Sequence, residues 1–181
     1  MTATETLKHE HQVILLVLDA AEREAQGIQR TGQVRPERTK EMIEFFRSFA
    51  DRCHHAKEEN LLFVKMEERG MPVQGGPIGV MLLEHNEGRR VVRATAEALP
   101  QAERGEAAAL ASVSDNLAAF AHLLRAHIHK EDHVLYPMAD QMLTAQDQKE
   151  LAAAFDRVEA EEMGEGVHEK YHQLAHRLAD G

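Results

Sequence analysis

Two histidine–glutamate pairs in this chain have the residue types and the spacing of metal ligands. His54 precedes Glu58 by four residues, and His127 precedes Glu131 by four. On an α-helix, side chains at positions i and i+4 lie on one face, about 40° apart around the axis. One imidazole and one carboxylate on neighbouring turns can therefore bind a single metal ion. Two such pairs facing each other in a helical bundle predict a two-metal site bridged by carboxylates.

The two pairs belong to a longer internal repeat. The segments around them align at a spacing of 73 residues (127 − 54), which also places Leu61–Phe63 on Val134–Tyr136. A single histidine precedes each pair, His11 in the first half and His85 in the second, at a spacing of 74 (85 − 11). The candidate metal ligands are therefore six residues, in this order: His11, His54, Glu58, His85, His127 and Glu131.

This ordered pattern resembles the hemerythrin-like family, the His-His-Glu cation-binding domains, over roughly residues 5–142. The resemblance implies a helical bundle around a pair of non-haem iron ions. The sequence departs from the oxygen-carrying members, in which the third helix supplies two histidines four apart and the fourth supplies a histidine and an aspartate five apart. Here Arg89 stands four residues after His85, and the fourth-helix pair is spaced four.

The departure leaves this chain one histidine short of the oxygen carriers' ligand set. It argues against reversible carriage of dioxygen. It also leaves one coordination position for water, a small ligand, Glu59 or a histidine of the C-terminal segment.

A second histidine–glutamate pair, His55 and Glu59, overlaps the first. Its equivalents in the second half are Ile128 and Asp132, which are not such a pair, so the repeat favours the first register. Glu59 remains a candidate as an acceptor behind the ligands or as an extra ligand. Tyr136 lies about one turn beyond the second pair, and we expect it in the core, where its hydroxyl could donate a hydrogen bond to the site.

The alternative to metal binding is a solvated polar face, or, for the two single histidines, core imidazoles bonded to backbone carbonyls. A solvated face would place the six residues among other polar ones. Instead they continue apolar stripes, such as Ile43, Phe46 and Ala50 before His54. Buried carboxylates cost several kcal/mol each unless they are paired or bound to metal. The pattern therefore favours metal binding.

These residues must be positioned by helices. Apolar residues recur at three, four and seven along most of the chain, and Ala, Leu, Glu and Arg favour helix. We expect Pro100 to end the third helix and Pro137 to kink or end the fourth. The expected helices span residues 4–29, 36–69, 77–99, 106 to about 137, 145–162 and 167–179.

The spacing of the histidines predicts how the first four helices are arranged. In an up-down bundle, residues at one height on neighbouring helices are symmetric about the connecting turn. The three midpoints between successive ligand histidines fall beside Gly32, Gly70 and Gly105, and turns favour glycine. The fold predicted is all-α, an up-down-up-down four-helix bundle with two additional C-terminal helices.

We divide the chain into a bundle of residues 1–143, with a pseudo-repeat of 1–73 and 74–143, and an extension of 144–181 packed on it. Three histidines, including His168 and His172, recur every fourth residue in the extension. One alternative for this face is simple packing or solvent exposure. The other brings His168 or His172 to the metal site as an extra ligand or as a hydrogen-bond donor behind the ligands.

Composition limits the partners. The formal charge of −10 argues against nucleic acid or an anionic membrane surface. We expect no apolar run to reach the ~20 residues of a membrane span. The single Cys53 excludes an internal disulfide and suits a reducing cytoplasm. We therefore expect a cytoplasmic protein with small-molecule partners.

Imidazole and carboxylate ligands suit iron, manganese or zinc. The bridged helical site and the resemblance both indicate two iron ions. The first functional hypothesis is a non-haem di-iron protein that binds or reacts with dioxygen, peroxide or nitric oxide, in sensing or detoxification. The alternative is a metal-binding module without turnover, serving iron storage, iron-centre repair or structure.

Overall fold

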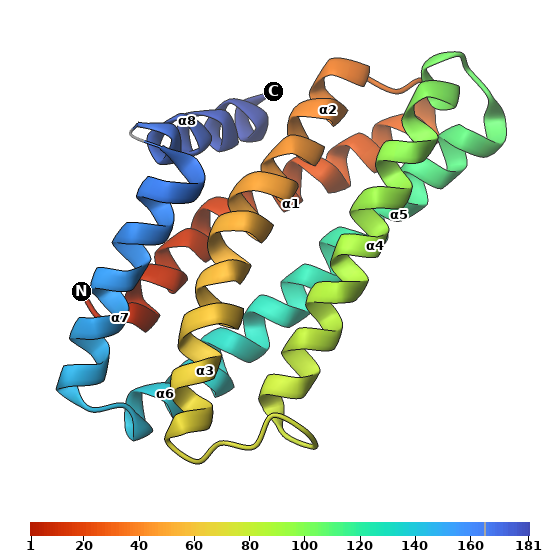
Figure 1. Ribbon diagram of the computed structural model, residues 1–181. Helices are drawn as coiled ribbons and strands as arrows, with labels where there is room; N and C mark the ends of the chain where they lie inside the picture. Colours follow the sequence, from red (N-terminus) through yellow and green to blue (C-terminus); the bar gives the residue numbers. More distant parts are fainter. Residues whose placement is uncertain (165) are drawn as a thin grey trace.

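A computed structural model of the chain describes residues 1–164 and 166–181; residue 165 and the side chains of residues 162 and 163 lie outside the description. Every element in the described residues is helical. Four long helical rods form a bundle, and two further helices lie against one side of it (Figure 1). The predicted all-α fold with two extra C-terminal helices is confirmed.

The first rod is α1 (Ala3–Thr31), which Thr2 and Glu5 start with reciprocal capping hydrogen bonds. The second rod begins at Pro36 and contains two π-helical segments, in the order α2 (Pro36–Phe45), η1 (Phe46–His55), η2 (Glu58–Leu62) and α3 (Phe63–Glu68). The third is α4 (Pro77–Glu103). The fourth comprises α5 (Ala107–Lys130), η3 (Glu131–Leu135) and α6 (Tyr136–Met142).

The connecting turns lie where the histidine spacing predicts them. Gly32, Gly70 and Gly105 all have left-handed backbone conformations, with φ of 66°, 99° and 82°. Only glycine adopts these angles without steric cost. The three turns reverse the chain between successive rods and bring the candidate ligands to one height.

The expected helix end at Pro100 is wrong, and of the two outcomes expected at Pro137, a kink or an end, the end is wrong. Pro100 lies inside α4, which continues to Glu103. A proline removes one backbone hydrogen bond, and so close to the helix end the remaining turn still closes. Pro137 does not end the fourth rod, because the π-helical segment η3 comes directly before it and the helix resumes as far as Met142.

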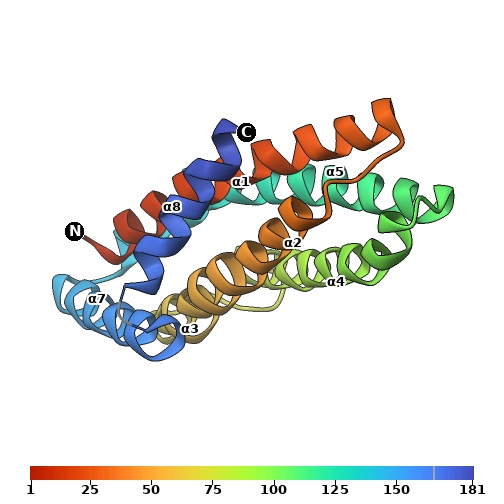
Figure 2. The ribbon, with the colours of Figure 1, turned by 90° about the horizontal axis from the view of Figure 1, so that it is seen from above.

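The C-terminal extension packs on the first two rods. It comprises α7 (Ala145–Val158), η4 (Glu159–Met163) and α8 (Val167–Asp180), and Thr144 caps α7 with Asp147 as predicted. In Figure 2, α8 lies across α1 and α2, and it contacts both. Ala175 and Leu178 of α8 join the main apolar core.

A polar layer separates two apolar cores. The larger core fills the half of the bundle that contains Val17, Phe45 and Leu117. The smaller one, with Leu7, Leu62 and Leu135, lies at the other end. The six candidate ligands belong to neither cluster and occupy the level between them.

One stretch, Ala107–Met142, is long and apolar enough to cross a membrane by length and composition, which corrects the expectation that no such run exists. Its Ala and Leu content raises the hydropathy. In this structure the stretch packs against α1 and α4, and it carries His127 and Glu131 on its buried face. Core helices of this kind pass the same test.

Gly32 and Gly27 allow the turn geometry to be tested with a matched pair. Gly32→Ala should lower the free energy of unfolding by about 1 kcal/mol, since the alanine must adopt a left-handed conformation. Gly27→Ala, inside α1 with open space around its Cα, should raise that free energy by about 0.5–1 kcal/mol. Denaturant unfolding of the two variants measures both changes. Equal effects would contradict the assigned turn.

Candidate metal centre

Seven buried side chains from all four rods meet in the polar layer. Each is at most 5% exposed. They form two overlapping groups, in each of which one potential ligand atom per residue lies within 4.8 Å of the others. The first group is His11, His54, Glu58 and Glu131, and the second is His55, His85, His127 and Glu58.

The two glutamates occupy equivalent places in the two halves. Glu58 is the first residue of η2 and Glu131 is the first residue of η3, and both segments are five residues long. A π-helical turn widens the helix by one residue and is frequent at functional sites. The sequence repeat of 73 residues is therefore also a repeat in backbone conformation, because both glutamates begin a π-helical segment.

Glu131 lies between imidazoles of the first and fourth rods, which pack against each other. One carboxylate oxygen, Oε2, is 3.3 Å from Nε2 of His11, and the other, Oε1, is 3.0 Å from Nε2 of His127. Glu131 could therefore hold a metal cation together with His11, His127 or both.

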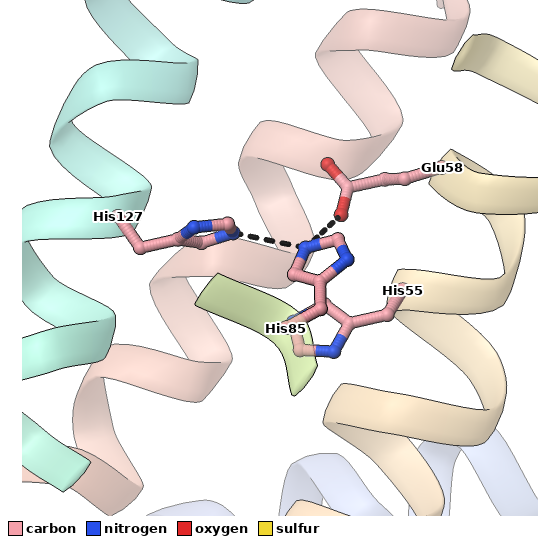
Figure 3. A group of neighbouring side chains, drawn as sticks. All are labelled: His55, Glu58, His85 and His127. Atoms are coloured by element: carbon pink, nitrogen blue, oxygen red, sulfur yellow. Dashed lines mark hydrogen bonds and ion pairs between the residues drawn. The ribbon is translucent and has the colours of Figure 1, made fainter. Parts of the chain in front are cut away.

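Glu58 lies between the other two imidazoles, but it presents the same oxygen to both, since its Oε1 accepts the hydrogen bond from Tyr136. Its Oε2 is 3.3 Å from Nε2 of His85 and 3.7 Å from Nε2 of His54. Figure 3 shows Glu58, His85 and His127 converging, with the two histidine Nε2 atoms 3.0 Å apart. Two ring nitrogens at this distance, both facing a carboxylate, mark a position that suits a shared cation.

A second set of carboxylates holds the imidazoles from behind. Nδ1 of each of the four predicted histidines lies 2.7–2.8 Å from a carboxylate oxygen. A carboxylate fixes the tautomer with the proton on Nδ1, which leaves the Nε2 lone pair free for a metal. The pairs are His11 with Asp132, His54 with Glu10, His85 with Glu59, and His127 with Glu84.

These pairs repeat between the halves of the bundle. Glu10 and Glu84 each precede a ligand histidine by one residue, and Glu59 and Asp132 each follow a ligand glutamate by one. Each of these carboxylates bonds a histidine on another rod. Every ligand-bearing rod therefore also supplies support for the ligand of a neighbouring rod.

The inner atoms fit a bound cation. Among the described residues, Nε2 of His54, Oε2 of Glu58 and both carboxylate oxygens of Glu131 are buried without a hydrogen-bond partner. Unpartnered buried carboxylate oxygens are costly. Bound metal would give these atoms partners, so the residues of the layer fit a metal cation.

The electrostatics of the layer also favour a cation. Burial lowers the pKa of His127, but Glu131 and Glu84 outweigh burial and raise that pKa to about 10. Burial raises the pKa of Glu131, yet His127 and His11 hold it well below the usual range. The site is thus built to keep its carboxylates ionised and to attract positive charge, whether it is carried by protons or by a metal.

His55 joins the centre, although the sequence repeat argued for the other register. It stacks on His85 with ring centroids 3.8 Å apart (Figure 3). Its Nδ1 lies 3.3 Å from Oδ1 of Asp51. The i→i+5 bonding of η1 reduces the rotation between successive residues, so His54 and His55 both turn inward. Asp51, four residues before His55, is the sequence signal that could have indicated this role.

The remaining sequence candidates lie around the centre in different roles. Glu59 turns away from the inner atoms to bond His85 and Arg89, so it acts as an acceptor behind the ligands. Tyr136 is fully buried, and its hydroxyl donates to Oε1 of Glu58 at 2.6 Å and lies 3.3 Å from Nε2 of His11. The predicted hydrogen bond from this tyrosine is therefore present.

His168 and His172 are not part of the inner cluster. Nε2 of His168 is 3.7 Å from Oε1 of Glu10, the carboxylate that holds His54, and His172 packs on Phe49. Lys57, fully buried, bonds both Glu10 and Glu159 of η4. The extension thus contacts Glu10, the carboxylate behind His54, and does not enter the inner cluster. The Lys57 ammonium group links Glu10 to Glu159 of the extension.

Removing the metal should lower the melting temperature. The buried inner atoms repel one another or stay unsatisfied without a cation, and binding to the folded state alone stabilises it by about 2.7 kcal/mol at a free-metal concentration 100-fold above Kd. Calorimetry of chelated and metal-loaded protein checks this. Identical melting temperatures would show that the layer binds no metal.

The contact of the extension with the centre should be measurable through Glu159. Glu159→Gln removes one of the two carboxylates bonded to buried Lys57 and should lower the free energy of unfolding by about 1 kcal/mol. Glu161→Gln in the same turn, whose side chain is exposed, serves as the control. Unchanged stability of both variants would show that η4 only covers the bundle.

Comparisons with known proteins agree with this geometry. The family described as "Hemerythrin HHE cation binding domain" matches residues 2–139. Uncharacterized proteins of Mycobacterium bovis and of two Mycobacterium tuberculosis strains are 24% identical to the chain over 165 residues. The match covers 91% of this chain and 64% of those relatives, so the chain spans less than two thirds of their length. No solved structure matches the chain significantly.

The matched range contains all seven residues of the buried cluster and most of the chain. The predicted resemblance is confirmed, and the function it supports at this level is the binding of metal cations. The chain belongs to the hemerythrin HHE cation-binding domain family.

Proposed function

We propose that this protein is a non-haem di-iron protein that binds or reacts with dioxygen, peroxide or nitric oxide, in sensing or detoxification. The observation that carries the proposal is the position of the two inner carboxylates. Glu131 lies between His11 and His127, and Glu58 lies between His54 and His85. This arrangement supports two cation positions that would share carboxylates.

The donor set supports iron. Imidazole nitrogens and carboxylate oxygens also suit manganese and zinc, but carboxylate-bridged pairs in helical bundles are characteristic of iron. When bound, a pair of irons supplies redox chemistry and an open coordination position for a small ligand.

The chain's own residues prepare this environment. Burial of the layer between two apolar cores excludes bulk water. Tyr136 holds a hydroxyl proton beside Glu58 and His11, next to one of the two cation positions. A proton donor in a dry site suits chemistry on small oxygen- or nitrogen-containing molecules better than static metal storage.

The structure supplies the histidine by which the expected ligand set fell short of that of the oxygen carriers, but it comes from a different helix. Arg89, at the position where the oxygen carriers have a second histidine, bonds Asp51 and Glu59 instead of entering the inner cluster. The fifth imidazole comes from His55 on the second rod. The two cation positions would therefore carry their histidines in a different distribution from that of the oxygen carriers.

A metal-binding module without turnover is the second candidate. It is favoured by the completeness of the support, since a carboxylate lies behind every inner imidazole and holds it in place. Such a rigid site also suits iron storage, iron-centre repair or a structural metal. In either case, we propose that the partners are small molecules and that the protein is cytoplasmic, consistent with its one buried thiol, Cys53.

The test is a pair of glutamine substitutions in iron-loaded protein. Glu58→Gln and Glu131→Gln should each lose at least one iron per chain, because each removes a charged ligand of both cation positions. Glu67→Gln, an exposed glutamate on the same rod, is the matched control and should retain the wild-type iron content. Metal analysis and the visible spectrum with azide measure the result.

Two outcomes separate the hypotheses. A Glu58 or Glu131 variant with two irons and an unchanged spectrum would rule out the ligand role. Wild-type protein that holds two irons but neither consumes peroxide nor changes its spectrum with peroxide, azide or nitric oxide would favour the module without turnover.

A further inference from the structure

A pocket of about 190 Å³ opens beside the metal centre, between η1, α4 and α5. Its apolar wall is formed by Phe46 and Ala50 of η1, Val92 of α4 and Phe120 of α5. Gly88 also lines it, and a Cβ at that position would lie 3.3 Å from the Phe120 ring. The absence of a side chain at Gly88 therefore lets α4 lie close to the Phe120 ring, and the ring still lines the pocket. The wall suits a small planar or aliphatic body.

The same pocket is bordered by positive charge. Arg47, Arg89 and Arg93 line it, and Asp51 is the one acidic residue among its lining residues. Arg89 is already paired with Asp51 and Glu59. Arg47 and Arg93 are exposed and form no ion pair with any described residue. In a chain with a formal charge of −10, two unpaired guanidinium groups at one pocket favour an anionic ligand.

The inner wall of the pocket includes residues that hold the histidines of the candidate metal centre in place. His55 lines the pocket and stacks on His85. Arg89 donates to Asp51, the partner of His55, and to Glu59, the partner of His85. A ligand in the pocket would therefore contact the residues that position two inner imidazoles without itself being a metal ligand.

We propose that this pocket binds a small organic anion, a carboxylate on an apolar body. The carboxylate lies between Arg47 and Arg93, whose guanidinium groups match it geometrically. The body lies against Phe46, Val92 and Phe120. The pocket volume limits the ligand to about the size of a single ring or a short chain.

Benzoate is the probe, and calorimetric titration into iron-loaded protein is the measurement. Arg93→Gln and Arg47→Gln should each raise the Kd for benzoate about tenfold, since each removes a charge-assisted hydrogen bond. Arg90→Gln is the matched control, because Arg90 is exposed on the same helix but pairs with Glu87 outside the pocket. Its Kd should equal that of the wild type. All of these side chains lie on the surface, so the variants should fold and keep their iron.

Three results would overturn the proposal. The first is the absence of benzoate binding at millimolar concentration. The second is an equal Kd in wild-type, Arg47→Gln and Arg93→Gln proteins, which would place benzoate on the metal instead. The third is equal affinity for benzoate and the neutral analogue benzyl alcohol, which would show an apolar site without anion recognition. Iron content measured on the same samples keeps a failure of this proposal distinct from a failure of the di-iron function.

Discussion

The structure depends on the burial of two ionised carboxylates, Glu58 and Glu131, in the middle of a helical bundle. Both are fully buried, and their inner oxygens lie 3.0–3.3 Å from imidazole nitrogens. Burying such charges without compensation is costly, so everything around them has to supply positive charge or a cation. The two apolar cores on either side keep this layer dry and fix its height. The bundle is best understood as a scaffold that makes those two charges tolerable.

The compensation is built from residues adjacent to the ligands in sequence. Glu10 and Glu84 stand one position before a ligand histidine, and each bonds the ligand histidine of a neighbouring rod. A neighbour on the helix points about 100° away from the ligand, toward the adjoining rod. Each rod therefore contributes to two interactions at once. This arrangement couples the rods to one another at the level of the metal centre.

The two halves are equivalent in pattern but differ in their surroundings. Lys57 is fully buried, with Glu159 of the extension covering it, whereas Lys130, its counterpart beside Glu84, is 40% exposed. Tyr136 adds a hydroxyl to the residue group that contains His11, and His55 adds an imidazole to the group that contains His85 and His127. The repeat makes the two groups of candidate ligands similar, and the departures from it make them chemically different. The pocket that His55 lines lies beside the group that contains His85 and His127.

The sequence by itself determined the positions of the turns and the identity of the principal cluster. Repeated spacing on helices fixes which side chains share a face, and glycines at the midpoints fix where the rods reverse, so height in the bundle follows from simple counting. Pairings between rods do not follow from counting. That Glu10 would hold His54, and that His168 would lie beside Glu10 and Glu159 instead of in the inner cluster, depends on how the rods and the extension are packed. The inward orientation of His55 was decided by the structure, because the wider π-helical turn of η1 changes the rotation per residue, and regular α-helical spacing does not anticipate that change. Asp51, four residues before His55, was the one sequence signal for it.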